Sequence, residues 1–187
     1  MTLAPRIATL YEAIESLPEG VTGEIIRGQL HTQPRPRGPH AIASSNLGAE
    51  LLFPYGRGRG GPGGWWIIDE LEIHFIRDTE ILVPDLAGWQ RKRMPALPDD
   101  QRFEVVPDWV CEILSPATAS KDRDIKMPVY AEYGVAHAWI VDPGDHSLEA
   151  FILNDGSWQR IARFEGDDTV TAPPFEAAGF VVADLWR

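Results

Sequence analysis

The stretch PDWVCEILSPATASKDRDIKMPVYAEYGV, residues 107–135, contains the signals that decide the fold. Its first part, DWVCEILS, is an almost continuous apolar run, which is typical of a strand with both faces covered. The part after Ser115 is charged and then takes on helical spacing as far as Gly134, a residue type that often follows a helix. We therefore expect a central strand, a loop and a helix. Pro128 leaves the start of that helix open, because proline fits best in a first turn.

One residue of the apolar strand is acidic. Glu112 lies between Cys111 and Ile113, so the predicted strand buries a carboxylate, which is costly unless a partner or a metal ion compensates it. Upstream, a second apolar run, ILVPD at residues 81–85, ends in Asp85. Taken alone, Asp85 fits a turn at a strand exit. Structural and functional interpretations of Glu112 weigh about equally at this point.

The rest of the chain predicts a mixed α/β fold within one domain, residues 1–187. Hydrophobic periodicity and turn residues give the other elements. These are a helix at 7–17, a hairpin at 23–33 turning at Arg27-Gly28, a helix at 40–56, two strands at 65–75 and 80–89 joined by the turn IRDT, a strand at 137–143, a hairpin at 148–164 turning at NDGS, and an apolar tail at 179–186. The tail is expected to pack on the protein's own sheet or to form an interface.

Composition narrows the class of protein. With 187 residues, 44% hydrophobic and 24% charged, the chain is an ordinary globular domain large enough to bury a core. No apolar run approaches the roughly 20 residues that a membrane span needs, and the N-terminus is not a secretory signal. Cys111 is the only cysteine, which excludes an intrachain disulfide and a multi-cysteine metal site. We expect a cytoplasmic protein with no membrane association.

The net charge of -11 argues against broad, non-specific adhesion to nucleic acid. A nuclease needs only a local basic surface, however, and its metal site adds acidic residues. The basic residues cluster at 35–37, 57–59, 91–93 and 121–126, and most such clusters are simply solvated surface. The glycine-rich run at 56–64 is expected to be a flexible loop. It lacks the Gly-Lys-Ser/Thr ending of a phosphate-binding loop.

Two carboxylates near strand ends can meet at one point, and hard divalent cations such as Mg²⁺ prefer oxygen ligands of this kind. A nearby lysine would stabilise the negative charge that develops on a phosphate. Lys121 and Lys126 both follow Glu112 closely enough for one of them to point back over the strand.

The central block closely resembles the signature of the Uma2 family (DUF820-like restriction endonucleases), a group of the PD-(D/E)XK nuclease superfamily. The matching positions are Pro84-Asp85, Glu112, Leu114-Ser115-Pro116, Thr118, Asp122 to Lys126, Tyr130, Gly134-Val135 and Trp139 to Pro143. The resemblance covers about residues 15–155, with a C-terminal hairpin and tail at 146–187. It implies a restriction-endonuclease-like core, in which helices flank a central mixed β-sheet.

The resemblance also implies roles for particular residues. Asp85 and Glu112 match the two metal-binding carboxylates, and Glu24 matches an acidic position that could complete the metal shell or be a solvated hairpin residue. The superfamily's usual Glu-x-Lys would require a lysine where this chain has Leu114. In Uma2-like sequences the lysine lies on the next helix, where Lys126 matches it, and Lys121 ranks second.

The remaining polar residues of the pattern have simpler interpretations. His40 is expected to cap a helix or to make a core hydrogen bond, with a phosphate contact as the alternative. Asp122 and Asp124 are expected at a helix N-terminus, where acidic residues are favoured. Asp142 is expected to end a strand and bind a turn. The aromatic side chains of Tyr130 and Trp139 are expected in the core.

These observations favour a Mg²⁺-dependent DNA endonuclease in which Mn²⁺ can substitute for Mg²⁺. A homodimer is expected, because cutting two strands calls for two symmetry-related sites. The alternative is a catalytically inactive binding or regulatory module on the same fold, which the net charge and Leu114 favour. A glycosidase with two carboxylates ranks low, since its chemistry gives the lysine no role.

Overall fold

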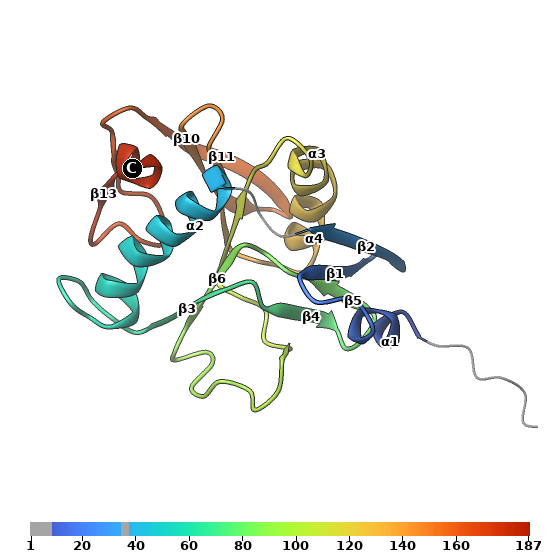
Figure 1. Cartoon of the computed structure of the whole chain (residues 1–187). Coiled ribbons are helices and arrows are strands. Elements are labelled where there is room, and N and C mark those ends of the chain that lie inside the picture. Colours follow the sequence, from blue (N-terminus) through green and yellow to red (C-terminus); the bar gives the residue numbers. More distant parts are fainter. Residues whose placement is uncertain (1–8, 35–37) are drawn as a thin grey trace, which may run out of the picture.

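Two β-sheets and a two-stranded ribbon make up the strands of the computed structural model, which describes residues 9–34 and 38–187 (Figure 1). The first sheet contains β1 (Val21–Ile26), β2 (Gln29–Pro34), β4 (Glu72–Ile76), β5 (Glu80–Leu82) and β7 (Arg102–Phe103), in the order β2-β1-β5-β4-β7. The second contains β3 (Trp65–Asp69), β6 (Leu86–Gln90), β8 (Trp109–Ile113), β9 (His137–Asp142), β10 (Ser147–Asn154) and β11 (Ser157–Glu165), in the order β11-β10-β9-β8-β6-β3. The ribbon pairs β12 (Thr169–Val170) with β13 (Phe180–Val181).

The strand β8 lies at the centre of the second sheet, as predicted. It is parallel to β9 and antiparallel to β6, which makes the sheet mixed. Cys111 and Ile113 face a core cluster that includes α2 (Gly38–Leu51), whereas Val110 faces a second cluster under the helix after β8. Both faces of β8 are therefore covered, which explains why its sequence is almost continuously apolar.

The segments 65–75 and 80–89 are not two strands, as predicted, but four. Each run breaks in the middle, so β3 and β6 pair in the second sheet while β4 and β5 pair in the first. The breaks face each other: Glu70 has a φ of 46° and its amide donates to the carbonyl of Asp85 at 3.3 Å. The second break, at Val83 and Pro84, is buried, so the apolar run continues across it. At the first break, the exposed Glu70 fits the alternation of polar and apolar residues that continues to Phe75, so the pattern did not mark it. Asp85 consequently lies at the junction of the two sheets.

The helix after β8 runs through three consecutive parts, α3 (Ala119–Lys121), the π-helical turn η2 (Asp122–Lys126) and α4 (Met127–Glu132). The amide of Met127 donates to the carbonyl of Asp122, the bond that makes this turn wide. Pro128, which has no N–H, follows immediately, so the widened turn accommodates it without breaking the helix. The helix ends before Gly134, whose φ is +79°, as predicted.

On the opposite face of the second sheet, α2 continues into the π-helical turn η1 (Leu52–Gly56) and packs against the C-terminal segment (Figure 1). That segment ends in the 3₁₀ turn η3 (Val182–Trp186). Val182 and Leu185 are completely buried, and the Asn46 amide donates to the carbonyls of Asp184 and Leu185. The apolar tail therefore belongs to the protein's own core. No helix in the two described ranges has the length and apolar character to cross a membrane.

The two predicted hairpins are confirmed. Arg27 and Gly28 connect β1 to β2 with φ values of 54° and 72°, the geometry that a two-residue turn needs to match strand twist. Asp155 and Gly156 do the same between β10 and β11, with φ values of 47° and 75°. The predicted helix at 7–17 appears as α1 (Leu10–Glu15), which Thr9 caps; residues 7 and 8 lie outside the described ranges.

The glycine-rich loop after η1 is more ordered than the sequence predicted. Its amides donate to carbonyls of η1: Arg57 to Leu52 at 2.9 Å, Arg59 to Phe53 at 2.8 Å, and Gly63 to Pro54 at 2.9 Å. Four of its glycines have positive φ angles, which only glycine adopts readily. The glycines thus serve to fold this loop tightly back onto the end of the helix. The basic cluster at 35–37 lies outside the described residues.

Candidate active site

Glu112 is the acidic residue of the central strand, and its side chain points toward the helix that follows β8. Only 2% of its surface is exposed. Lys126 Nζ lies 2.8 Å from its Oε1, and the hydroxyl of Tyr130 donates to the same oxygen at 2.5 Å. A buried carboxylate is tolerated when charged and hydrogen-bonding partners surround it. Lys126 and Tyr130, one helical turn apart, supply both kinds of partner.

Lys126 is as buried as Glu112, with 1% of its surface exposed. Its ammonium group donates to the Val83 carbonyl at 2.9 Å and contacts Glu24 Oε1 at 3.0 Å in addition to Glu112. An ammonium has three protons, so these three acceptors satisfy it completely. Burial alone would lower the pKa of Lys126, but the carboxylates of Glu112 and Glu24 outweigh it and raise that pKa. Lys126 is therefore a protonated cation at neutral pH.

Glu24 on β1 holds both candidate lysines. Its Oε1 accepts the amide of Val83 at 2.9 Å, and its Oε2 accepts Lys121 Nζ at 2.7 Å. Lys121 also donates to the Gln33 side chain on β2 at 2.6 Å. Burial favours the neutral acid, but the two lysines outweigh it and lower the pKa of Glu24. Glu24 is not a solvated hairpin residue, since only 1% of it is exposed.

Asp85 sits at the start of β6, directly beside the end of β8. Its Oδ2 accepts the amide of Ile113 at 2.6 Å, and its Oδ1 lies 3.0 Å from Nε2 of His40. His40 belongs to the first turn of α2, so this contact joins the helix to the sheet junction. Burial would lower the pKa of His40, but Asp85 outweighs it and raises that pKa. His40 thus contacts an acid of the candidate site instead of capping its helix.

Asp122 differs from the sequence-based expectation. It does not lie exposed at a helix N-terminus but is 3% exposed inside the helix, at the start of η2. Its backbone amide donates to the carbonyl of Thr118, which places it one turn into the helix. Burial raises its pKa, partly offset by Lys126 and by a hydrogen bond with the Thr118 side chain. Asp122 is a fourth acidic residue around Lys126, and the sequence spacing of four between them could have indicated this.

Two carboxylates, those of Glu112 and Glu24, therefore contact one fully buried ammonium, and the charges of Asp122 and Asp85 also raise the pKa of that ammonium. Burial raises the pKa of Glu112 well above its usual range; Lys126 opposes that rise, and Asp122, Asp85 and Glu24 add to it. Negative charge is in excess, and carboxylate oxygens are the donors that Mg²⁺ prefers, so the chemistry of this donor set fits a hard divalent cation. In the described ranges, no three His, Cys, Asp or Glu side chains are already grouped as metal ligands, and those of Glu24 and Glu112 converge on Lys126.

The structure brings together all the residues that the sequence selected. Glu112 and Glu24 both contact Lys126, and Asp85 contacts the backbone next to Glu112. Tyr130 lies in the core and His40 makes a hydrogen bond there, as predicted, but their acidic partners, Glu112 and Asp85, were not predicted. Asp122 was assigned to a helix end, and its place in the site was missed. Their positions depend on packing between distant elements, which spacing does not reveal. Asp142 accepts two turn amides, from Gly144 and Asp145, as predicted.

Comparison with known proteins gives a family and a fold. The sequence matches the Uma2 family model, described as "Putative restriction endonuclease", over residues 8–184. No curated protein matches the sequence. The fold is similar to the crystal structure of "a putative nuclease belonging to DUF820" from Anabaena variabilis, with a TM-score of 0.73 and 22% identity over 94% of this chain and 96% of that one. That likeness shows the fold, and because the family match spans almost the whole sequence, this chain belongs to the Uma2 family.

Proposed function

We propose that this protein is a Mg²⁺-dependent endonuclease that hydrolyses phosphodiester bonds in DNA. One observation carries the proposal: a buried, protonated lysine contacts a strand carboxylate, Glu112, while a second acid, Asp85, lies immediately before the neighbouring strand, β6. The family's description as a restriction endonuclease supports the same reaction class. An excess of carboxylates beside an ammonium is what a reaction on a phosphate with a bound cation requires.

The roles of the residues follow from their contacts. Asp85 and Glu112 would hold the cation, which supplies Lewis acidity that activates water and neutralises phosphate charge. Lys126 is protonated, so its proposed role is to stabilise the negative charge that develops on the phosphate, not to accept a proton. Hydrolysis forms a new O–P bond from water as the bond to the leaving oxygen breaks, and a proton ends on that oxygen. Glu24 orients both lysines, and its place in the metal shell stays a prediction.

Substitution of the two carboxylates tests this function. D85N and E112Q keep the side-chain shapes, and we expect both to reduce Mg²⁺- or Mn²⁺-dependent nicking of plasmid DNA to background. D167N is the matched control, because Asp167 is 91% exposed and lies outside the site. Circular dichroism must show that all three variants are folded. If folded D85N and E112Q nick DNA as fast as the wild type, the proposal is wrong.

A second candidate function is a binding or regulatory module without catalysis. The saturated hydrogen bonding of Lys126 favours it, since an ammonium with three buried acceptors also serves as a structural counter-ion. Leu114, buried where the superfamily has its lysine, points the same way. Titration calorimetry with Mn²⁺ separates the two: heat that disappears in D85N favours the enzyme, whereas no heat at millimolar Mn²⁺ with an intact fold favours the module.

We also propose that the protein acts as a homodimer. Cutting both strands of a duplex requires two sites, and twofold symmetry is the usual way to provide them. The apolar tail does not supply the interface, because Val182 and Leu185 are buried in the protein's own core. Light scattering during size-exclusion chromatography, with and without duplex DNA, measures the mass directly. A monomer under both conditions would limit the proposed enzyme to single-strand nicking.

A further inference from the structure

Among the residues that the structure describes, four basic side chains have no carboxylate within 4 Å. Within residues 9–34 and 38–187, each other Arg and Lys lies within 4 Å of a carboxylate; these are Arg27, Arg77, Arg93, Arg102, Lys121, Arg123, Lys126, Arg160, Arg163 and Arg187. The exceptions are Arg57, Arg59, Arg91 and Lys92. Cationic side chains without a carboxylate partner are unusual in a protein with a net charge of -11. These four residues come from just two loops.

The two loops meet at one end of the second sheet. The guanidinium of Arg91 donates to the carbonyl of Gly56 at 2.9 Å and to that of Trp65 at 3.2 Å, and it lies 4.0 Å from the centre of the Trp66 ring. The backbone amide of Arg91 also donates to the carbonyl of Gly64 at 2.9 Å. Arg91 therefore fixes its own loop against both ends of the glycine-rich loop. We call the surface formed by Arg57, Arg59, Arg91 and Lys92 the basic edge.

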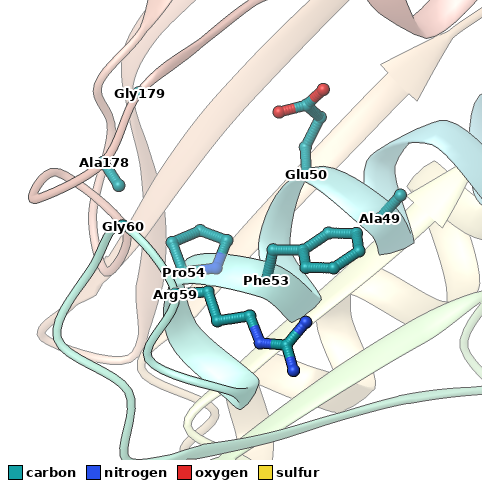
Figure 2. A pocket seen from close by; sticks show the side chains of 8 residues that line it. All are labelled: Ala49, Glu50, Phe53, Pro54, Arg59, Gly60, Ala178 and Gly179. Carbon is teal, nitrogen blue, oxygen red and sulfur yellow. The ribbon is translucent and has the colours of Figure 1, made fainter.

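Phe53 lies beside this edge and is 46% exposed. The guanidinium of Arg57 lies 5.6 Å from the centre of its ring, and Arg59 lines a pocket of about 320 Å³ with Phe53, Pro54 and Gly179 (Figure 2). Glu50 is the one acidic residue of this pocket, and in Figure 2 it points away from Arg59. The guanidinium groups beside this exposed ring carry the positive charge that binding to a phosphate backbone requires.

The basic edge lies at a defined distance from the candidate active site. Asp85 and Arg91 flank the two ends of β6, a separation of about 20 Å for an extended strand. The helix α2 gives a second measure: His40 contacts Asp85 near its start, and Gly56 contacts Arg91 at the end of η1, about 24 Å along the axis. Both measures agree, so α2 and β6 run together from one surface to the other.

We propose that the basic edge binds the phosphate backbone of duplex DNA about six base pairs from the bond that is cut. The spacing follows from the separation of about 20 Å and the rise of about 3.4 Å per base pair. The helix α2 runs between the two surfaces; its most exposed residues there, Ile42, Ser45 and Ala49, carry no charge, and the partly exposed Glu50 near its end is its one acidic residue. This inference rests on the proposed function, since it assigns the substrate of the same site a second contact.

Binding without cleavage tests the basic edge directly. The triple variant R57Q/R59Q/K92Q removes three charges but leaves Arg91, whose hydrogen bonds hold the loops. We expect it to bind a labelled duplex of about 24 base pairs in EDTA at least about tenfold more weakly than the wild type, measured by fluorescence anisotropy. The slope of log K against log salt should also become shallower by about 2 to 3, because each lost phosphate contact contributes about 0.9.

The control is R77Q/R163Q/R187Q, which changes the net charge equally at exposed, ion-paired positions. It should bind like the wild type. Equal weakening of both triple variants would overturn the proposal, because net charge alone would then explain binding. So would a triple variant of the basic edge that binds normally but changes its mass in solution, which would make this surface a contact for a second, acidic copy. Wild-type protein that binds no DNA at low salt would overturn it too.

Substrate length separates this proposal from the proposed function. A duplex of about 8 base pairs cut at its centre is too short to reach the basic edge, whereas one of about 24 base pairs is long enough. We expect R57Q/R59Q/K92Q to raise KM for the longer duplex and to leave kcat and the shorter duplex unchanged. If the wild type binds DNA through the basic edge but cuts neither duplex, the endonuclease fails and the binding surface stands. If the wild type cuts both duplexes and R57Q/R59Q/K92Q cuts both equally well, the endonuclease stands and the binding surface fails.

Discussion

The role of Tyr130 in the candidate site depends on its hydroxyl group. Its hydroxyl donates to Glu112 at 2.5 Å inside the core, and burial, together with the charge of Glu112, raises the pKa of Tyr130 well above its usual range. The hydroxyl therefore stays a donor across the physiological pH range. Removing it leaves a buried carboxylate with one partner fewer, which typically costs about 1–3 kcal/mol.

We therefore expect Y130F to lower the free energy of unfolding by about 1–3 kcal/mol, measured by urea denaturation. Y133F is the matched control, because the Tyr133 hydroxyl has no hydrogen-bond partner among the described residues and lies nearly one turn further along the same helix. Y133F should unfold like the wild type. Equal unfolding free energies for Y130F and the wild type would contradict the hydrogen bond to Glu112.

At the residue scale, the contact between Glu112 and Lys126 could be anticipated from the sequence, because chemistry and spacing coincide there. Glu112 was conspicuous because an acid in an apolar strand needs a partner, and Lys126 fitted the family pattern. The burial of Asp122 and the contact of Tyr130 with Glu112 were not predicted, because each residue also fits an ordinary local role, as a helix-end acid or a core aromatic. What changes their role is the direction in which the helix packs on β8. That direction depends on contacts between elements, which a single sequence does not display.

The helix after β8 is attached to the second sheet by an ion-pair cluster distinct from the candidate site. Glu149 on β10 is buried and accepts from Arg123 on η2 at 2.6 Å and from Arg160 on β11. Burial would raise the pKa of Glu149, but the two arginines outweigh it and lower that pKa below its ordinary value of 4.5. A depressed pKa means that the ionised form stabilises the fold above pH 4.5 and that this stabilisation disappears as the pH falls below it.

We expect E149Q to unfold about 1 kcal/mol more easily at pH 7, a small value because both arginines are partly exposed to solvent. The difference from the wild type should narrow as the pH falls from 4.5 downward, and it should be constant above pH 6. Thermal unfolding followed by circular dichroism at several pH values gives this curve. E165Q, which changes an exposed acid on β11, should show no such narrowing. If the difference in thermal stability between E149Q and the wild type grew as the pH fell, Glu149 would not be the ionised partner of the two arginines.

At the scale of elements, both hairpins and the central strand could be predicted, whereas the division of 65–90 between two sheets could not. Arg27-Gly28 and Asp155-Gly156 mark turns through local backbone chemistry. The break at Glu70 has no such signal, because this exposed residue fits the alternation of polar and apolar side chains that an unbroken strand would also show. Apolar periodicity reports burial but not the identity of the neighbouring strand.

The whole molecule depends on its C-terminal segment. Phe180, Val182 and Leu185 are buried in the same cluster as α2 and β8, and the Asn46 amide donates to carbonyls of residues 184, 185 and 187. Burying one large apolar side chain contributes about 1.5–3 kcal/mol, so three are worth about as much as the whole stability of a typical domain.

We therefore expect deletion of residues 180–187 to abolish cooperative unfolding and to expose apolar surface, measured by calorimetry and by binding of a hydrophobic dye. Deletion of Arg187 alone is the control, because it leaves all three buried side chains in place. That protein should retain its transition. A longer deletion with an unchanged melting temperature would show that the segment is peripheral after all.

The contacts of Lys126 have a consequence for comparing homologues. Its ammonium group holds Glu24 on β1 and the carbonyl of Val83, just after β5, against Glu112 on β8. A lineage that lost nuclease activity would still need this lysine to keep its sheets together, so selection for folding would preserve it. Retention of the lysine in a homologous sequence is therefore no sign of a working enzyme.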